Sequence, residues 1–169
     1  MAKLNSLEEL YLNSLEDLYD AEKRIVKALP KMADKASGTA LRSALEHHLE
    51  QTKTHVARVE QIFRELGKPA KGETCDGMKG ILDEGDDVVG DAENPAVRDA
   101  AIIAAAQRVE HYEMAGYGSA RTWAQQLSDT TGADLLQQTL DEEKAADLKL
   151  TEIAVSTANP QAQGAAATG

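Results

Sequence analysis

Glutamates and histidines interrupt four otherwise apolar helical stripes, and they are the residues that could carry chemistry. Glu22 lies in the first stripe, His48 in the second, Glu110 and Glu113 border or enter the third, and Glu143 lies in the fourth. A carboxylate that is buried without a partner is costly. Because such groups occur in all four stripes, we expect them to meet and to share positive charge.

Position along each helix supports the same grouping. Steps of three and four residues place each stripe on one helical face, and a helix rises about 1.5 Å per residue. Among the polar residues of the four stripes, one from each helix lies within about 5 Å of the predicted helix midpoint, namely Glu22, Thr52, Glu113 and Glu143. His48 and His55 lie one turn on either side of Thr52. The pattern predicts one polar layer at the middle of a helical bundle.

The chemistry of this layer is that of a metal site. Several carboxylates in an apolar core repel one another, and cations relieve that repulsion. Carboxylates and imidazoles suit iron, manganese or zinc, so we expect one or two divalent ions, with iron first. Known dinuclear bundles carry a Glu on two helices and Glu-x-x-His on the other two. This chain approaches that plan without completing it, because Glu143 is followed at the third position by Ala146.

Other readings stay open for the flanking residues. His55 fits a hydrogen-bonded core histidine as well as a ligand. Glu50 and Glu142 flank the layer and could support ligands or lie on the surface, and Tyr112 could orient a carboxylate or pass an electron. His47 and His111 fall off the stripes, so we expect them on the surface. The whole layer could also be structural and serve only to set helix register.

The elements that must position these residues are four long helices. We predict them at roughly 6–35, 39–66, 95–127 and 133–157, with a short outer helix within 77–90 and a disordered tail at 159–169. Ser6 with Glu9 opens the first, Gly67 closes the second, and Asn94 with Pro95 opens the third.

Loop lengths select among bundle topologies. The connection from 67 to 93 has 27 residues, far more than neighbouring helices need, whereas the other two loops are short. We therefore predict a single domain over 1–158, an all-α, ferritin-like antiparallel four-helix bundle with one long crossover between the second and third long helices.

Composition limits partners and compartment. The chain has 4% aromatic residues, a net charge of −11 and a pI of about 4.8. The low aromatic content favours helices over a sandwich or barrel, and the acidic balance disfavours nucleic acid and anionic membranes. With no apolar run of membrane length and no secretory signal, we expect a cytoplasmic protein. The lone Cys75 cannot form an internal disulfide. Exposed helix faces with small residues predict a homodimer.

Four segments together resemble a known family. They are residues 17–33 (DLYDAEKRIVKALPKMA), 48–63 (HLEQTKTHVARVEQIF), 109–122 (VEHYEMAGYGSART) and 140–154 (LDEEKAADLKLTEIA). In this order they resemble the YciE/YciF family of bacterial ferritin-like stress proteins. The resemblance implies a rubrerythrin- or ferritin-like fold, a dimer and a role in stress responses. It also places Glu22, His48, Glu113 and Glu143 at the family's polar core positions.

Two functions follow as expectations. In the first, the metal centre serves oxidative chemistry with oxygen or peroxide, or metal handling. In the second, the protein is a non-catalytic dimeric bundle whose polar layer is structural.

Overall fold

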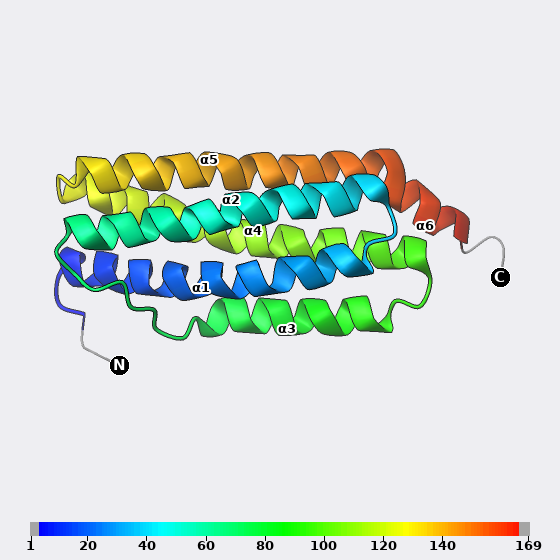
Figure 1. Ribbon diagram of the computed structural model, residues 1–169, viewed down its shortest axis with the longest axis horizontal. Helices are drawn as coiled ribbons and strands as arrows, with labels where there is room; N and C mark the ends of the chain where they lie inside the picture. Colours follow the sequence, from blue (N-terminus) through cyan, green and yellow to red (C-terminus); the bar gives the residue numbers. More distant parts are fainter. Residues whose placement is uncertain (1–3, 166–169) are drawn as a thin grey trace.

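Four long helices lie side by side and make up most of the molecule (Figure 1). They are α1 (Leu7–Lys35), α2 (Thr39–Glu65), α4 (Pro95–Gln126) and α5 (Thr130–Ile153). The structure is a computed structural model that describes residues 4–165, and it has no strand in that range. The prediction of an all-α fold is therefore confirmed.

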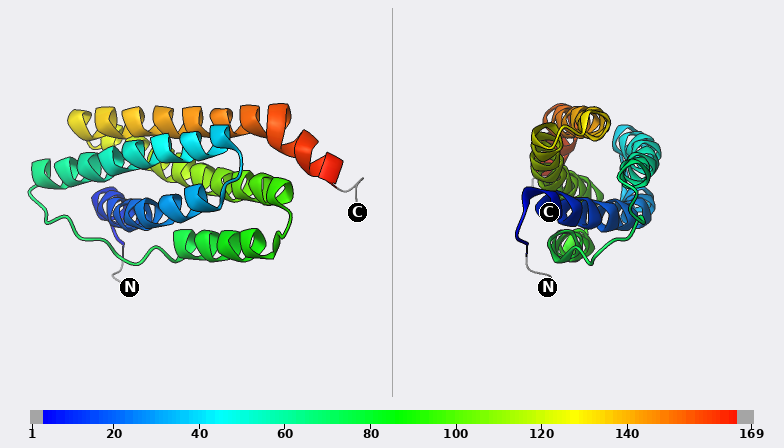
Figure 2. Two further views of the ribbon diagram at one scale, coloured as in Figure 1. Left: turned by 45° about the vertical axis from the view of Figure 1, so that its right-hand side comes forward. Right: turned by 90° about the vertical axis from the view of Figure 1, so that its left-hand side faces the viewer.

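The four long helices form a ring in which each packs on two neighbours. The contacting pairs are α1 with α2, α2 with α5, α5 with α4, and α4 with α1. The end-on view in Figure 2 shows the same ring, with α3 outside it. This arrangement turns one face of every long helix toward a shared interior.

That interior consists of two apolar clusters with polar residues between them. Along α1, Leu18 belongs to one cluster and Ile25 to the other, and Glu22 lies between them. Along α4, Val109 and Tyr117 flank Glu113 in the same way. The apolar stripes thus build a core on each side of the polar level and shield it from water.

The long connection contains a fifth substantial helix, α3 (Asp76–Asp91). It is slightly longer than the predicted 77–90 and packs on α4 and α1 through buried Met78 and Val89. In Figure 1, α2 ends at the left of the molecule and α4 begins at the right. The connection therefore runs along the length of the molecule, and α3 covers the outside of the α1–α4 pair.

The predicted helix ends agree with the structure where a cap was recognised. The Ser6 side chain accepts a hydrogen bond from Glu9 N at 3.1 Å, and the Asn94 side chain accepts one from Ala96 N at 2.9 Å. Gly67 has φ 65°, as a glycine just after a helix should. The last long helix begins at 130 rather than 133, because Asp129 caps it by accepting from Gly132 N at 2.8 Å.

The expected disordered tail is wrong for residues 159–165, which form helix α6 (Asn159–Ala165). A π-helical segment, Ala154–Ala158, joins it to α5, and the Asn159 amide bonds to the Ala154 carbonyl. Pro160 has no amide to donate and crowds the preceding turn, and the wider π turn absorbs this. The chain bends there rather than stopping (Figure 1). The rest of the expected tail, 166–169, lies outside the described residues.

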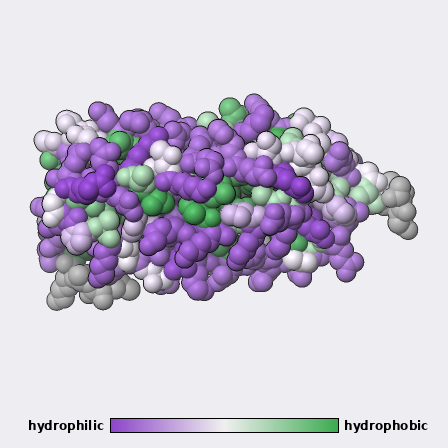
Figure 3. Space-filling view, viewed as in Figure 1, coloured by the Kyte–Doolittle hydropathy of each residue, from purple (hydrophilic) through white to green (hydrophobic). Residues whose placement is uncertain are grey.

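One face of the molecule can be judged in the space-filling view (Figure 3). The face in Figure 3 is mostly hydrophilic, with small scattered hydrophobic patches. Within residues 4–165, every helix is too short or too polar to cross a membrane.

Candidate metal centre

Six buried titratable side chains meet at the middle of the helix ring. Every long helix contributes, α1 by one residue, α2 by two, α4 by two and α5 by one. In chain order they are Glu22, His48, His55, Glu110, Glu113 and Glu143. Each is at most 5% exposed. Helical spacing explains the convergence, because each residue continues an apolar stripe that already faces the interior.

The six residues divide into two groups that could each hold a metal ion. The His55 group consists of Glu22, His55 and Glu143, and the His48 group consists of His48, Glu110, Glu113 and Glu143. Within each group, one potential ligand atom per residue lies within 4.8 Å of all the others. Glu143 belongs to both groups, so the two candidate sites are adjacent.

The imidazoles face the carboxylates closely. His55 Nδ1 lies 2.9 Å from Glu143 Oε1 and 3.3 Å from Glu22 Oε1. His48 Nε2 lies 3.3 Å from Glu110 Oε1 and 3.5 Å from Glu143 Oε2. These distances suit ion pairs, yet neither ring nitrogen makes a hydrogen bond of acceptable geometry. The ring nitrogens and carboxylate oxygens face a common space, and their orientations do not suit hydrogen bonds between them.

Within residues 4–165, the same cluster holds nearly all the buried side-chain nitrogen and oxygen atoms that lack a hydrogen-bond partner. Among residues 4–165 the only such atom elsewhere is Arg121 Nε. Both oxygens of Glu113 and of Glu143, both ring nitrogens of His48, and His55 Nδ1 are unpaired. Native proteins leave few buried polar groups unsatisfied, and an unpaired charged group is especially costly. A bound cation is the partner that this acceptor-rich set fits.

Burial and close charged neighbours together shift the pKa values of the cluster. It raises the pKa of Glu110 and Glu113 well above the usual range, and the neighbouring carboxylates add to that shift. Burial also raises the pKa of Glu22, against the opposing contact with His55. At Glu143, burial acts in the same direction, but contacts with His55 and Glu110 outweigh it and leave the pKa lowered. Without a cation, part of the layer must hold protons to remain folded.

The pKa values of the two histidines shift in opposite directions. Burial lowers the pKa of His48. Burial acts the same way on His55, but its contacts with Glu143 and Glu22 outweigh that effect and raise its pKa to about 10. His55 is therefore a cation in the metal-free protein, and it must lose a proton before Nδ1 can bind a metal.

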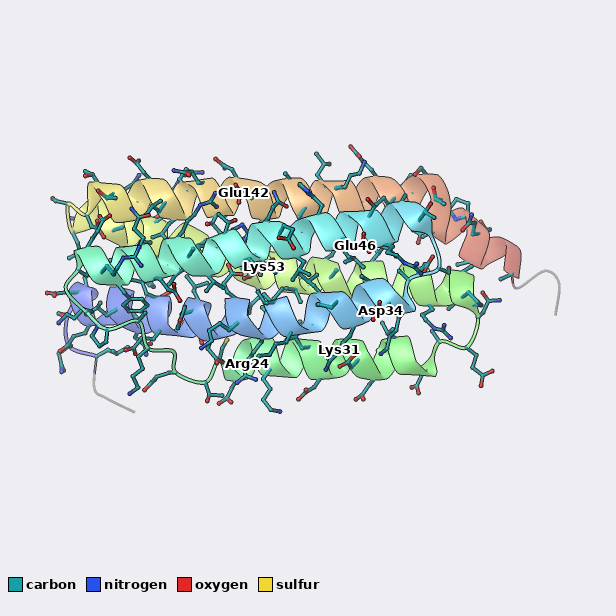
Figure 4. The ribbon with its side chains drawn as sticks, in the orientation of Figure 1. Arg24, Lys31, Asp34, Glu46, Lys53 and Glu142 are labelled. Carbon is teal, nitrogen blue, oxygen red and sulfur yellow. The ribbon has the colours of Figure 1, made fainter. Side chains whose placement is uncertain are left out.

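Outer residues hold the cluster in place. Tyr117 donates a hydrogen bond to Glu22 Oε1. His55 Nε2 lies 2.8 Å from Glu142 Oε2, and Arg58 binds both oxygens of that carboxylate at 2.7 and 2.9 Å. Glu142 lies near the middle of α5 (Figure 4) and is 31% exposed. A chain of contacts thus links buried His55 to the surface and fixes its ring orientation.

The structure brings together all five residues predicted as ligands, namely Glu22, His48, Glu110, Glu113 and Glu143. It adds His55, for which sequence reasoning had left a plain core role open. The available signal was its position on the apolar face of α2, three residues after Thr52. Thr52 itself turns to the backbone, donating to the His48 carbonyl at 2.8 Å.

The residues that flank the cluster differ in exposure and in their contacts. His47 and His111 are exposed, as expected for residues off the stripes. Glu50 is also exposed, which is one of the two positions that the sequence allows for it. Glu142 supports His55, one of the two roles left open for it. Tyr112 does not contact the buried carboxylates by hydrogen bonding. Its hydroxyl donates to Asp17 at 2.9 Å and lies 3.1 Å from the buried Cys75 sulfur.

Comparison with known proteins identifies relatives over nearly the whole chain. The model of DUF892, a domain family of unknown function, matches residues 6–163. Protein YciF of Escherichia coli K12 is 41% identical over 164 residues, which cover 96% of this chain and 99% of that protein.

Solved structures agree. The crystal structure of the E. coli stress protein YciF matches with a TM-score of 0.88, covering 92% of this chain and 99% of that one. YcfI of Rhodopseudomonas palustris, for which a structural role has been suggested, matches with a TM-score of 0.86 at 41% identity, covering 88% and 95%. A Xanthomonas campestris protein at 18% identity shares the fold, with a TM-score of 0.71. The family resemblance of the four sequence segments is thereby confirmed, and the chain belongs to the YciF family, within the domain family DUF892.

Proposed function

We propose that this protein binds two divalent metal ions in its core, one at the His55 group and one at the His48 group. Iron is the expected metal, with manganese or zinc as alternatives, because carboxylates and imidazoles suit all three. Glu143, which belongs to both groups, would contact both ions.

The set of buried, unpaired acceptor atoms carries this proposal. Four carboxylates and two imidazoles face one another without hydrogen bonds between the two ring nitrogens and the facing oxygens. Two divalent cations carry four positive charges, which would balance the four carboxylates and let both histidines be neutral ligands. Ionised carboxylates only accept hydrogen bonds, so without cations the cluster must keep protons on some of its carboxyl groups and on His55.

We further propose that the four long helices form a ferritin-like bundle with a crossover between α2 and α4. The bound ions would supply redox chemistry with oxygen or peroxide, or reversible metal handling, in the stress context of the E. coli relative. The chain's own residues hold and shield the site. Tyr117 fixes Glu22, Glu142 with Arg58 fixes His55, and the two apolar clusters cover the site on both sides along the helix axes.

A structural role for the polar layer is the second candidate. Its support is that His55, when protonated, already lies within ion-pair distance of Glu22 and Glu143 and so compensates part of their charge. The structural role suggested for the R. palustris relative points the same way. Metal content decides between the two candidates.

The test is elemental analysis of protein purified without chelators and then supplied with iron, manganese or zinc. Wild type should hold two ions per chain. Glu143→Ala should lose most of both, and Glu22→Ala mainly one. Glu46→Ala, on the exposed side of α2, should match wild type and is the control. If wild type binds no more metal than a Glu113→Ala, Glu143→Ala double variant, the layer is structural.

We also propose that the protein is a cytoplasmic homodimer that engages neither nucleic acid nor membrane. The net charge of −11 supports the last two points, because it repels phosphate backbones and anionic lipid surfaces.

A further inference from the structure

A cavity of about 540 Å³ lies along the seam between α2 and α5. Ala44 on α2 and Ala146 on α5 form part of opposite walls, and most of the accessible lining surface is apolar, although half of the lining residues are polar or charged. A volume in this range, with apolar walls and a few polar groups, is typical of sites for small ligands.

The cavity reaches one of the two candidate metal sites. Its buried titratable lining residues are His48 and Glu110, both members of the His48 group. Glu22 and His55 are not among the lining residues. The two groups therefore differ in access. A molecule that enters the cavity can contact His48 and Glu110 of the His48 group, whereas Glu22 and His55 do not line the cavity.

Ala146 explains why the space is open. It lies three residues after Glu143, the place that a histidine takes in the Glu-x-x-His pattern of dinuclear bundles. An alanine there leaves the seam empty, and His48 provides an imidazole from α2 instead. The group therefore contains a histidine from α2, and the small side chain of Ala146 leaves space at the seam.

The cavity offers an anion polar contacts at both of its ends. His47 and Lys149 line it at exposed positions, where Lys149 Nζ also lies 3.2 Å from Glu152 Oε2, and Glu110 is its only carboxylate-bearing lining residue. A cation at the His48 group would add positive charge at the inner end. An apolar body with one negative head group suits these features together.

We propose that this cavity binds a small amphipathic monocarboxylate, such as a medium-chain fatty acid, with its carboxylate at the His48 group and its hydrocarbon chain along the alanine walls. The assignment of the head group rests on the proposed metal centre. The apolar part of the assignment rests on the cavity alone.

Sodium octanoate is the probe. It is titrated by calorimetry into full-length protein loaded with zinc, with bound zinc measured on the same samples. We expect saturable binding of one octanoate per chain, at least tenfold tighter than in metal-free protein and tighter than octanol. Absence of saturable binding to zinc-loaded protein overturns the proposal, and equal affinity for octanol overturns the head-group assignment.

Variants locate the binding. Ala44→Leu and Ala146→Leu narrow the cavity from opposite walls at half-buried helical positions. Each should weaken octanoate binding at least tenfold while zinc content and helical circular dichroism stay unchanged. Ala57→Leu, at an exposed position of α2 outside the lining, is the matched control and should bind like wild type. Unchanged affinity in both cavity variants overturns the proposal.

The zinc measurement keeps the two proposals separable. Zinc-loaded protein that ignores octanoate refutes the cavity assignment and leaves the metal centre standing. Protein that takes up none of zinc, iron and manganese refutes the metal centre and the head-group assignment. In that case the apolar site is tested with metal-free protein. Octanoate binding that Ala44→Leu abolishes supports the apolar site, and absence of octanoate binding to the metal-free wild type overturns it.

Discussion

The ring orientation of His55 depends on Glu142, a residue whose role helical spacing does not determine. Glu142 Oε2 lies 2.8 Å from Nε2, the ring nitrogen that faces away from the cluster. When His55 is neutral, this contact keeps the proton on Nε2 and leaves the Nδ1 lone pair toward Glu22 and Glu143. Arg58 in turn holds Glu142 by two hydrogen bonds. The ring orientation of His55 is thus fixed by contacts that begin at the surface with Arg58 and Glu142.

Glu142→Gln should therefore weaken metal binding without removing the site. A neutral amide is a poorer acceptor for the Nε2 proton and loses the ion pair with Arg58, so we expect affinity to fall about 10- to 100-fold. Competition titration with a chromophoric chelator measures it. Asp141→Asn, at the adjacent exposed position, is the control. Equal affinities for Glu142→Gln and Asp141→Asn would remove Glu142 from this role.

The raised pKa of His55 gives the metal-free protein a distinct pH dependence. The pKa of His55 is about 10 in the folded protein, against an ordinary 6.5. Between pH 6.5 and 10 the folded state therefore still holds a proton that the unfolded chain has already lost. This contribution to stability is complete below pH 6.5 and is lost as the pH rises toward 10. Glu110 and Glu113, whose pKa values are also raised, act in the same direction.

We predict that the free energy of unfolding falls between pH 7 and 9 in protein treated with chelator. The contribution from His55 has a slope of up to about 1.4 kcal/mol per pH unit. Urea denaturation at several pH values measures it, and His55→Gln should show a shallower slope. A wild-type stability that is constant or rises over this range would contradict the electrostatics inferred for the cluster.

At the scale of elements, two glycines near the centre of α4 differ in what surrounds them. A Cβ at Gly116 would lie 2.9 Å from Leu18 Cδ2 on α1, and Leu18 is itself packed in the core. A Cβ at Gly118 would meet no atom within 4 Å. Close approach of α1 and α4 therefore explains Gly116 but not Gly118, for which the structure offers no packing reason.

The two alanine substitutions should have different effects on stability. Gly118→Ala should stabilise the protein by about 0.5–1 kcal/mol, because alanine restricts the unfolded chain and favours helix. Gly116→Ala gains the same helix preference but forces Leu18 to shift, so it should be less stable than Gly118→Ala by about 1 kcal/mol or more. Thermal or urea unfolding of both variants gives the difference. Equal stabilisation would mean that the α1–α4 contact is loose.

At the scale of the whole molecule, the most exposed large apolar side chains lie on one helical surface. Leu148 is 59% exposed and Val155 is 69% exposed, the highest values among the large hydrophobic residues of the described chain. They are seven residues apart along α5 and the π segment, which is about two turns, and so they share a face. Such a face is suited to a second copy of the chain.

We predict a homodimer at tens of micromolar that uses this face. The double variant Leu148→Glu, Val155→Glu should shift the mass in light scattering toward a monomer, because it places charges in an apolar contact. Val88→Glu changes a residue on α3 that is 46% exposed and should leave the mass unchanged. A monomeric wild type would refute the dimer, and a dimeric double variant would refute this surface.

The sequence by itself determined the helices and much of the cluster. Apolar spacing of three and four residues places Glu22, Glu113 and Glu143 on buried faces, and caps such as Ser6 and Asn94 fix where helices begin. Apolar spacing and capping both depend on residues close together in the sequence, so they predict helices without knowledge of the fold. Pro160 shows where local rules fail, because packing of α6 on α4 carries the helix past a residue that usually ends one.

Only the tertiary structure decided which groups share each site. His55 and His48 have the same helical signal, yet they fall into different groups joined by Glu143, because that division depends on how α1, α4 and α5 are rotated and staggered against α2. The role of Glu142 and the cavity beside Ala146 depend likewise on side chains from separate helices. Periodicity fixes which face of a helix is buried, whereas contacts between helices depend on crossing angles and heights that the pattern within one helix does not contain.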